Sequence, residues 1–317
     1  MNIREALHRG SHALAEAASE EAALEAELLL AHALGTDRTH LYQRLPDDLP
    51  PDAAAAFDAL LRRRLAHEPV PYILGRKEFF GLEFEVTPAA IIPRPETETL
   101  VELVLAFCAS RASGDRLRIA DVGVGCGAIA VSLAASLPQA EIIAVDVSAE
   151  ALALARRNAE RHGVAERIGF REGDLLAPLQ GSAHPVAKGD SPGREPVEGP
   201  AYPEPKPGVS RDSSRRVDVI AANLPYVRSA DFEASPPEIR EHEPRLGLDG
   251  GADGLRLIER LLRDAPRYLE PGGALFAEIG EEQGEAARSL AAQSFPAARI
   301  EIKQDLSGLD RVLVVCT

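Results

Sequence analysis

The chain has 317 residues, more than the roughly 100–200 of a typical single domain, so its length predicts two domains. Its 45% hydrophobic and 27% charged residues are typical of a globular protein and exclude a wholly disordered chain. The 50 acidic and 35 basic residues give a net charge of −15, which disfavours a chain-wide electrostatic grip on a nucleic-acid backbone.

Residues 1–69 are predicted to form a small helical domain. Apolar residues recur at helical spacing in SEEAALEAELLLAHALG, where Leu24, Leu28 and His32 would share a face, and DAAAAFDALLRRRLAHE repeats the pattern. The run Arg62-Arg63-Arg64 could indicate nucleic-acid binding, but on an amphipathic helix we interpret it as a solvated face.

The periodicity changes in residues 70–94. Bulky apolar and polar residues alternate around Gly81 in EFFGLEFEVTPAAII, which predicts a β-hairpin that links two parts of the chain. Pro93 and Pro95 then end the strand pattern.

Residues 95–317 alternate between strands and helices. The segments LRIADV, EIIAVDV, RIGFREGD, VDVIAAN and GALFAEIG are predicted strands separated by helices, so we expect an α/β domain whose parallel sheet is covered on both faces. The last two segments, AARIEIKQD and DRVLVVCT, are joined by a short turn and predict an antiparallel hairpin at the sheet edge. Between residues 180 and 216, 17 of 37 residues are Pro, Gly or Ser, which predicts a disordered insertion.

A glycine-rich segment, ADVGVGCGAIAVSLA, follows the first of these strands and opens a helix. Gly123, Gly125 and Gly127 remove side chains where a backbone must approach a nucleotide-like ligand. The spacing satisfies both the dinucleotide fingerprint and the glycine pattern of S-adenosylmethionine-dependent methyltransferases. Asp146, at the end of the next strand, could accept hydrogen bonds from ribose hydroxyls in either case. The glycine-rich segment and Asp146 together predict a nucleoside cofactor, but they do not indicate which one.

Two later positions add to this site. Asp174 could accept a hydrogen bond from an adenine amino group, with Leu175 as an apolar wall, although a surface carboxylate is an equal alternative. The element Asn223-Leu224-Pro225-Tyr226 follows an apolar strand, where the Asn oxygen and a nearby carbonyl could accept both protons of a planar NH₂ group and Tyr226 could pack on its face. Such a clamp suits methylation of an amide or an exocyclic amine without a strong general base. The alternative is an Asx turn that caps the strand.

The residues resemble the release-factor glutamine methyltransferases (PrmC/HemK family). The resemblance covers nearly the whole chain outside residues 180–216, and it rests on these segments: PYILGRKEFFGLEFEV, IIPRPETE (91–98), DVGVGCGAIAVSLA, Asn-x-Pro-Tyr, and EPRLGLDGGADGL (243–255). It implies a helical substrate-recognition domain at 1–69, a linking hairpin at 70–94 and, at 95–317, a class I S-adenosylmethionine-dependent methyltransferase domain of Rossmann-like fold.

The resemblance also implies an activity and its residues. The expected reaction is methylation of the side-chain amide nitrogen (N5) of the glutamine in the Gly-Gly-Gln loop of translation release factors. The catalytic residues would be Asn223, Pro225 and Tyr226, and 223–226 would hold the substrate amide. The cofactor-binding residues would be Gly123, Val124, Gly125, Cys126, Gly127, Asp146, Asp174, Leu175 and Asn223.

Position 224 departs from the family pattern. The family usually has Asn-Pro-Pro-Tyr, whereas Leu224 adds a backbone N–H but keeps the carbonyl of the proposed clamp. Asn-Leu-Pro-Tyr is also typical of the adenine dimethyltransferases of ribosomal RNA. Adenine N6-methylation of RNA or DNA is therefore the alternative, while the IPRPETE segment and the helical domain favour a protein glutamine.

The remaining features concern compartment and partners. Cys108, Cys126 and Cys316 form no CxxC pair, which argues against a disulfide framework or a metal site and favours a reducing compartment. The charged N-terminus, MNIREALHRG, is unlike a secretory signal. We therefore expect a cytoplasmic, monomeric enzyme whose partner is a release factor, without membrane or direct nucleic-acid binding.

Overall fold

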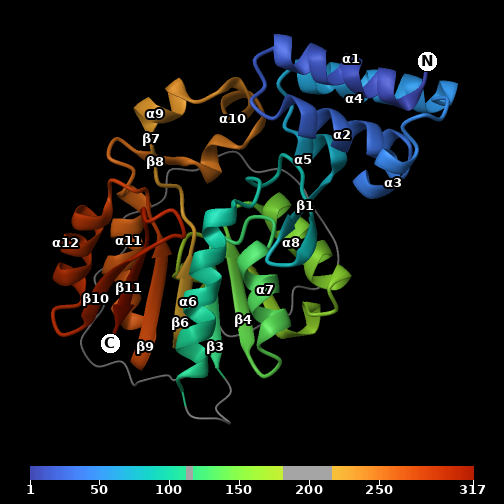
Figure 1. Cartoon of the computed structure of the whole chain (residues 1–317). Helices are drawn as coiled ribbons and strands as arrows, with labels where there is room; N and C mark the ends of the chain where they lie inside the picture. The colour runs from blue at the N-terminus through green and yellow to red at the C-terminus, as the bar shows by residue number, and fades with distance from the viewer. Residues whose placement is uncertain (112–116, 181–215) are drawn as a thin grey trace, which may run out of the picture.

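The computed structural model describes residues 1–111, 117–180 and 216–317 (Figure 1). The insertion predicted at 180–216 lies almost wholly outside these ranges. Within them, no helix is long and apolar enough to cross a membrane. Figure 1 shows the N-terminal helices at the top of the molecule and the large sheet below them.

The N-terminal part is helical, as predicted. Its helices are α1 (Ile3–Glu16), α2 (Ala22–Ala33), α3 (Arg38–Gln43), α4 (Pro51–Leu65) and α5 (Val70–Leu74). They enclose a core of their own around the fully buried Phe57.

The predicted apolar face of α2 was wrong. The helix buries Ala22, Ala26, Leu29 and Leu30, whereas Leu24 and Leu28 are only half-buried and His32 is exposed. The helix is apolar nearly all round, so spacing alone could select a stripe well away from the one that packs against α1 and α4.

The arginine run was also only partly solvated. Arg64 is 9% exposed, and its guanidinium pairs with Glu25 at 2.9 Å and with Glu238 at 2.7 Å. Because Glu238 lies on α10 (Pro237–His242), this ion pair ties the helical domain to the second domain. His242 Nε2 approaches the carbonyl of Ala66, at the end of α4, at 3.1 Å.

The hairpin begins later than the sequence pattern predicted. Strands β1 (Arg76–Phe79) and β2 (Leu82–Glu85) pair antiparallel, but Val70–Leu74 form the helix α5, because Pro71 is well tolerated in a first helical turn and Val70 and Ile73 pack into the helical core. The turn between the strands contains Gly81 at φ +72°, as its glycine suggests.

The second domain contains a seven-stranded sheet of order β10-β11-β9-β6-β3-β4-β5. Five strands are parallel, and β10 and β11 form the predicted antiparallel hairpin at the edge. The strands are β3 (Arg118–Val122), β4 (Glu141–Asp146), β5 (Ile168–Glu172), β6 (Val217–Ala222), β9 (Leu269–Glu278), β10 (Arg299–Gln304) and β11 (Asp310–Cys316).

Helices cover both faces of the sheet, as predicted for a parallel sheet (Figure 1). Side chains of β3 alternate between two cores: Ile119 packs with α6, α7 and α8, and Ala120 packs with α11 and α12. The helices are α6 (Glu98–Ala109), α7 (Ala128–Ser136), α8 (Ala149–Arg161), α9 (Ser229–Ala234), α11 (Arg256–Asp264) and α12 (Gly284–Ser294), and a short pair, β7 (Val227–Arg228) and β8 (Asp249–Gly251), lies beside α9.

A buried asparagine joins the hairpin to the sheet domain. Asn158 of α8 accepts from the Glu85 N–H at 2.8 Å and donates to the Glu85 carbonyl at 2.9 Å and to the Cys126 carbonyl at 2.8 Å. All the hydrogen-bonding capacity of this side chain except one acceptor site is used, which offsets the cost of burying it. The segment that follows the hairpin is thereby held at a fixed place beside the glycine-rich loop.

Candidate active site

A cavity of about 640 Å³ lies at the carboxyl edge of the parallel sheet. The ends of β3, β4 and β6 form one side, residues 88–91 after the hairpin form another, and residues 244–247 form a third. Ligand sites of open α/β sheets lie at this edge, and the volume is within the roughly 300–1,000 Å³ of small-molecule sites.

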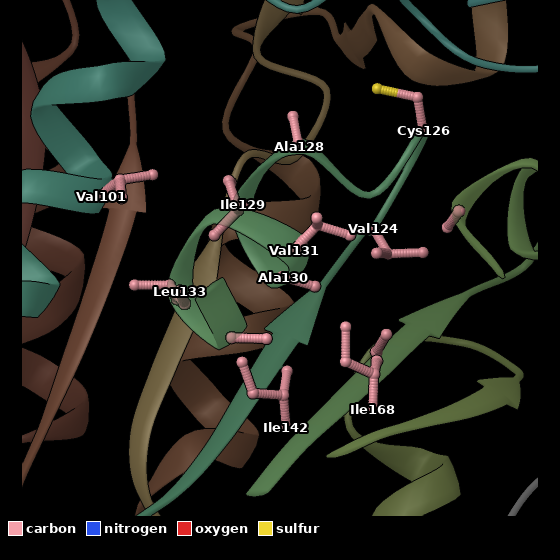
Figure 2. Close-up of a cluster of buried hydrophobic side chains, with 14 of the residues drawn as sticks. Val101, Val124, Cys126, Ala128, Ile129, Ala130, Val131, Leu133, Ile142 and Ile168 are labelled. Carbon is pink, nitrogen blue, oxygen red and sulfur yellow. The ribbon is translucent and has the colours of Figure 1, made fainter. Parts of the chain in front are cut away.

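The glycine-rich loop presents its backbone to this cavity. Gly123, Gly125 and Gly127 have φ of +82°, +54° and +91°, a region where other residues are strained. Gly123 and Gly125 line the cavity. The side chains of Val124 and Cys126 are 5% and 4% exposed and belong to the core cluster drawn in Figure 2, so these two residues can reach a ligand only through backbone atoms.

Close packing also fixes the ends of this loop. A Cβ on Gly127 would lie 3.2 Å from Ala155 of α8, and one on Gly123 would lie 3.1 Å from Leu224 Cδ2. Leu224 is 5% exposed, so the residue that departs from the family pattern fills the space above Gly123. Burial raises the pKa of the Cys126 thiol to about 12, which leaves it unreactive.

Asp146 supports the loop and lines the cavity. Its Oδ2 accepts from the Gly125 N–H at 3.0 Å, and its Oδ1 accepts from the Ser148 N–H at 2.9 Å. Each carboxylate oxygen keeps a further lone pair, so the predicted ribose contact remains open to it.

Asp174 and Leu175 also line the cavity, beyond the end of β5. The Asp174 side chain is 53% exposed and pairs with Arg260 at 2.5 Å, so it stands at the rim. Leu175 is buried with φ +49°, a strained conformation for a leucine, and such strain is concentrated at functional sites. Their contacts with an adenine ring stay predictions.

The Asn223-Leu224-Pro225-Tyr226 element follows β6. Its four residues do not all face the cavity. Asn223, Leu224 and Pro225 line the cavity, but Tyr226 lies behind them and its hydroxyl donates to Glu278 Oε1 at 3.1 Å. Burial raises the pKa of Tyr226 above its ordinary value. Packing of the Tyr226 ring on a substrate stays a prediction, whereas its bond to Glu278 shows that it also supports the element from behind.

Asn223 presents one end of its amide to the cavity. Its Nδ2 donates to Thr97 Oγ1 at 3.0 Å, and no hydrogen bond from any described residue reaches its Oδ1. The backbone carbonyl of Leu224 is likewise free of hydrogen bonds from the described chain. Two acceptors at adjacent residues are thus available to one planar donor group.

Sequence reasoning missed a clasp over the cavity. Glu243 is 6% exposed; its Oε2 accepts from the Ile92 N–H at 3.0 Å and its Oε1 accepts from Arg94. A Cβ on Gly247 would lie 2.7 Å from Ile91 Cγ2, so the two chain segments touch. The signal was present in IIPRPETE and EPRLGLDGGADGL, two segments that carry the family resemblance but for which no structural role was predicted.

A second missed residue is Asp121, at the end of β3. It is fully buried, its Oδ2 accepts from the Ala130 N–H at 2.9 Å, and its Oδ1 has no hydrogen-bond partner in the described chain. Burial raises the pKa of Asp121 to about 7. Its position two residues before Gly123 gave a weak signal, since an acid inside an apolar strand is rare.

Comparison with known proteins agrees with this geometry. The family model of the PrmC N-terminal domain matches residues 5–75, and that of a methyltransferase domain matches residues 119–185. Release factor glutamine methyltransferases of Geobacter sulfurreducens, Cereibacter sphaeroides and Moorella thermoacetica are 40%, 39% and 38% identical to this chain. The alignments cover 98%, 99% and 98% of this chain and 95%, 98% and 97% of those relatives.

The chain belongs to the release factor glutamine methyltransferase family. The predicted resemblance and the Rossmann-like α/β fold are thereby confirmed. The matched methyltransferase domain contains the glycine-rich loop, Asp146, Asp174 and Leu175, which places all four features within the part that the family shares with other methyltransferases.

Proposed function

We propose that this chain methylates the side-chain amide nitrogen of the glutamine in the Gly-Gly-Gln loop of translation release factors, with S-adenosylmethionine as methyl donor. The observation that carries the proposal is the pair of available acceptors, Asn223 Oδ1 and the Leu224 carbonyl, on a cavity that the glycine-rich loop also lines. Nearly full-length similarity to relatives named for this activity supports the substrate.

The residues present fit S-adenosylmethionine. The backbone of Gly123 and Gly125 lies open to the cavity, Asp146 offers acceptors for ribose hydroxyls, and Leu175 offers an apolar wall. Among the described residues, no group of His, Cys, Asp and Glu could hold a metal ion. When bound, the cofactor would supply a methyl group on a positively charged sulfur, which is a strong electrophile.

The acceptors of the clamp match the chemistry of an amide. An amide nitrogen is a poor nucleophile because its lone pair is delocalised into the carbonyl group. Asn223 Oδ1 would accept one N–H and the Leu224 carbonyl the other, which fixes the plane of the amide and raises electron density on nitrogen. A nitrogen–carbon bond forms as the carbon–sulfur bond breaks, and one N–H proton is then released to solvent.

The partner and compartment follow from this substrate. We propose a release factor as the macromolecular partner and the cytoplasm as the compartment, which accords with the free thiols Cys108, Cys126 and Cys316. Full-length relatives do not favour adenine N6-methylation, the alternative drawn from Leu224. Leu224 has a packing role above Gly123 that needs no change of substrate.

A competition assay tests the proposal. Equimolar release factor and adenine-containing RNA are incubated with the chain and methyl-labelled S-adenosylmethionine, and label is counted in protein and RNA separately. We expect label in the protein alone, and its loss when the loop glutamine is replaced by glutamate. Label in the RNA would overturn the proposal in favour of the adenine alternative.

The variant Asn223→Ala separates substrate binding from cofactor binding. It should lower kcat about 100-fold, the usual order of effect when one preorganised hydrogen-bonding group is lost, with the cofactor Kd changed less than about threefold. Equal losses in both quantities would assign Asn223 to the cofactor instead.

A further inference from the structure

Buried polar side chains form hydrogen bonds behind the proposed substrate clamp, Asn223 and Leu224. Asn223 Nδ2 donates to Oγ1 of Thr97, which is 4% exposed, and Tyr226 donates to Oε1 of Glu278, which is 1% exposed. Thr97 lies in the short 3₁₀ helix Pro95–Thr97 before α6, and Glu278 ends β9. Two distant segments therefore hold the 223–226 element through hydrogen bonds, one to Asn223 and one to Tyr226.

The number of protons on each group indicates which group donates and which accepts in these buried hydrogen bonds. A hydroxyl has one proton, and Thr97 Oγ1 already accepts from Asn223, so its own proton is available to another acceptor. The acceptor that we assign to this proton is Glu278, because the Thr97 hydroxyl favours its ionised form and its Oε2 has no hydrogen-bond partner in the described chain. A buried carboxylate oxygen without a partner is costly, which draws the Thr97 proton toward it.

We propose that Thr97 and Glu278 are positioning residues that determine which end of the Asn223 amide faces the substrate. The inference rests on the proposed function, because it concerns the same clamp. The two ends of an amide have nearly the same shape, so packing alone does not select one. An acceptor behind Asn223 selects the NH₂ end, which leaves Oδ1 toward the cavity. The reversed amide would set its NH₂ against the NH₂ of the substrate, two donors without an acceptor.

This role accounts for part of the IIPRPETE segment. Its residues Ile92 and Arg94 are held by Glu243, as described above, and Thr97 sits three residues beyond Arg94. The segment is also anchored after Thr97, since the side chain of Glu98 accepts from the Phe80 N–H at 2.9 Å. The segment thus brings a hydroxyl to Asn223 and is held by hydrogen bonds on both sides of Thr97.

The test compares Thr97→Val with Thr97→Ser. Valine keeps the shape of threonine and removes the hydroxyl, so the Asn223 amide loses its partner, and we expect kcat to fall at least about tenfold because misorientation at a reacting centre is costly. Serine restores the hydroxyl, and we expect kcat within about threefold of the wild-type value. The cofactor Kd should change less than twofold in both variants. Thr317→Val, the same change at the far end of the chain, is the matched control and should have no effect.

A readout without activity separates this inference from the proposed function. Hydrogen exchange of the Asn223 side-chain NH₂, assigned by its loss in Asn223→Ala, should be slow in the wild type and in Thr97→Ser and at least about tenfold faster in Thr97→Val. Unchanged exchange and unchanged kcat in Thr97→Val would overturn the inference, as would a Thr97→Ser variant as impaired as Thr97→Val. A wild-type chain that exchanges as expected but transfers no methyl group would overturn the proposed function alone.

Discussion

The buried Glu278 makes a prediction about stability and pH. Burial raises its pKa from 4.5 to about 7 in the folded protein. Between these pH values the folded state keeps the proton while the unfolded chain has lost it, so the folded state binds more protons and the free energy of unfolding falls as the pH rises. The raised pKa corresponds to a decrease of about 3 kcal/mol in the free energy of unfolding, and this decrease is complete above about pH 7.

Glu278→Gln removes this titration and keeps an oxygen that can accept from Tyr226. We expect the free energy of unfolding of the variant, relative to the wild type, to increase by about 3 kcal/mol between pH 4 and pH 8. Asp121, whose pKa is also raised by burial, is present in both proteins and cancels in the difference.

Urea denaturation followed by circular dichroism, at five pH values across this range, measures the difference directly. If the free energies of unfolding of the two proteins changed with pH in parallel, the reasoning would be refuted, because Glu278 would then ionise at the same pH in the folded and unfolded states. A variant that was more stable than the wild type only at acidic pH would refute it too, since the sign of the linkage would be reversed.

Three further predictions follow from the loop. Asp146→Ala should weaken cofactor binding roughly tenfold in calorimetry, since ribose acceptors and the support of the loop are both lost; an unchanged Kd would remove Asp146 from the site. Gly127→Ala should lower the free energy of unfolding by about 1–3 kcal/mol in urea, because of its φ of +91° and its contact with Ala155; a stability equal to wild type would contradict the packing described. Cys126 should react with a thiol reagent far more slowly than Cys316 in the native protein, and equal rates would show that the loop opens.

The architecture was predictable because its pattern is local. Apolar strand segments alternating with amphipathic helices specify a parallel sheet, and the glycines after β3 mark the site because positive φ is otherwise strained. The buried face of α2 and the start of the hairpin were not predictable, since both depend on where neighbouring elements pack in the folded protein. Val70–Leu74 reads as strand-forming on its own and is helical because Val70 and Ile73 join the helical core.

Part of the site was beyond reach of the sequence for a related reason. Asn223 could be assigned from its place after a strand, but its partner Thr97 is 126 residues away in the chain. The clasp joins Ile92 to Glu243 across 151 residues. Contacts of this kind leave no periodicity, and only the part that segments 91–98 and 243–255 have in the family resemblance signalled that they had a role.

The central claim is that a glutamine amide of a release factor receives the methyl group at the Asn223 clamp. The most direct measurement is the intact mass of a release factor incubated with this protein and S-adenosylmethionine, followed by peptide mapping of the Gly-Gly-Gln loop. The account predicts a gain of one methyl group on that glutamine, and its absence with Asn223→Ala. An unmodified loop, with S-adenosylmethionine bound by the wild-type protein, would contradict it.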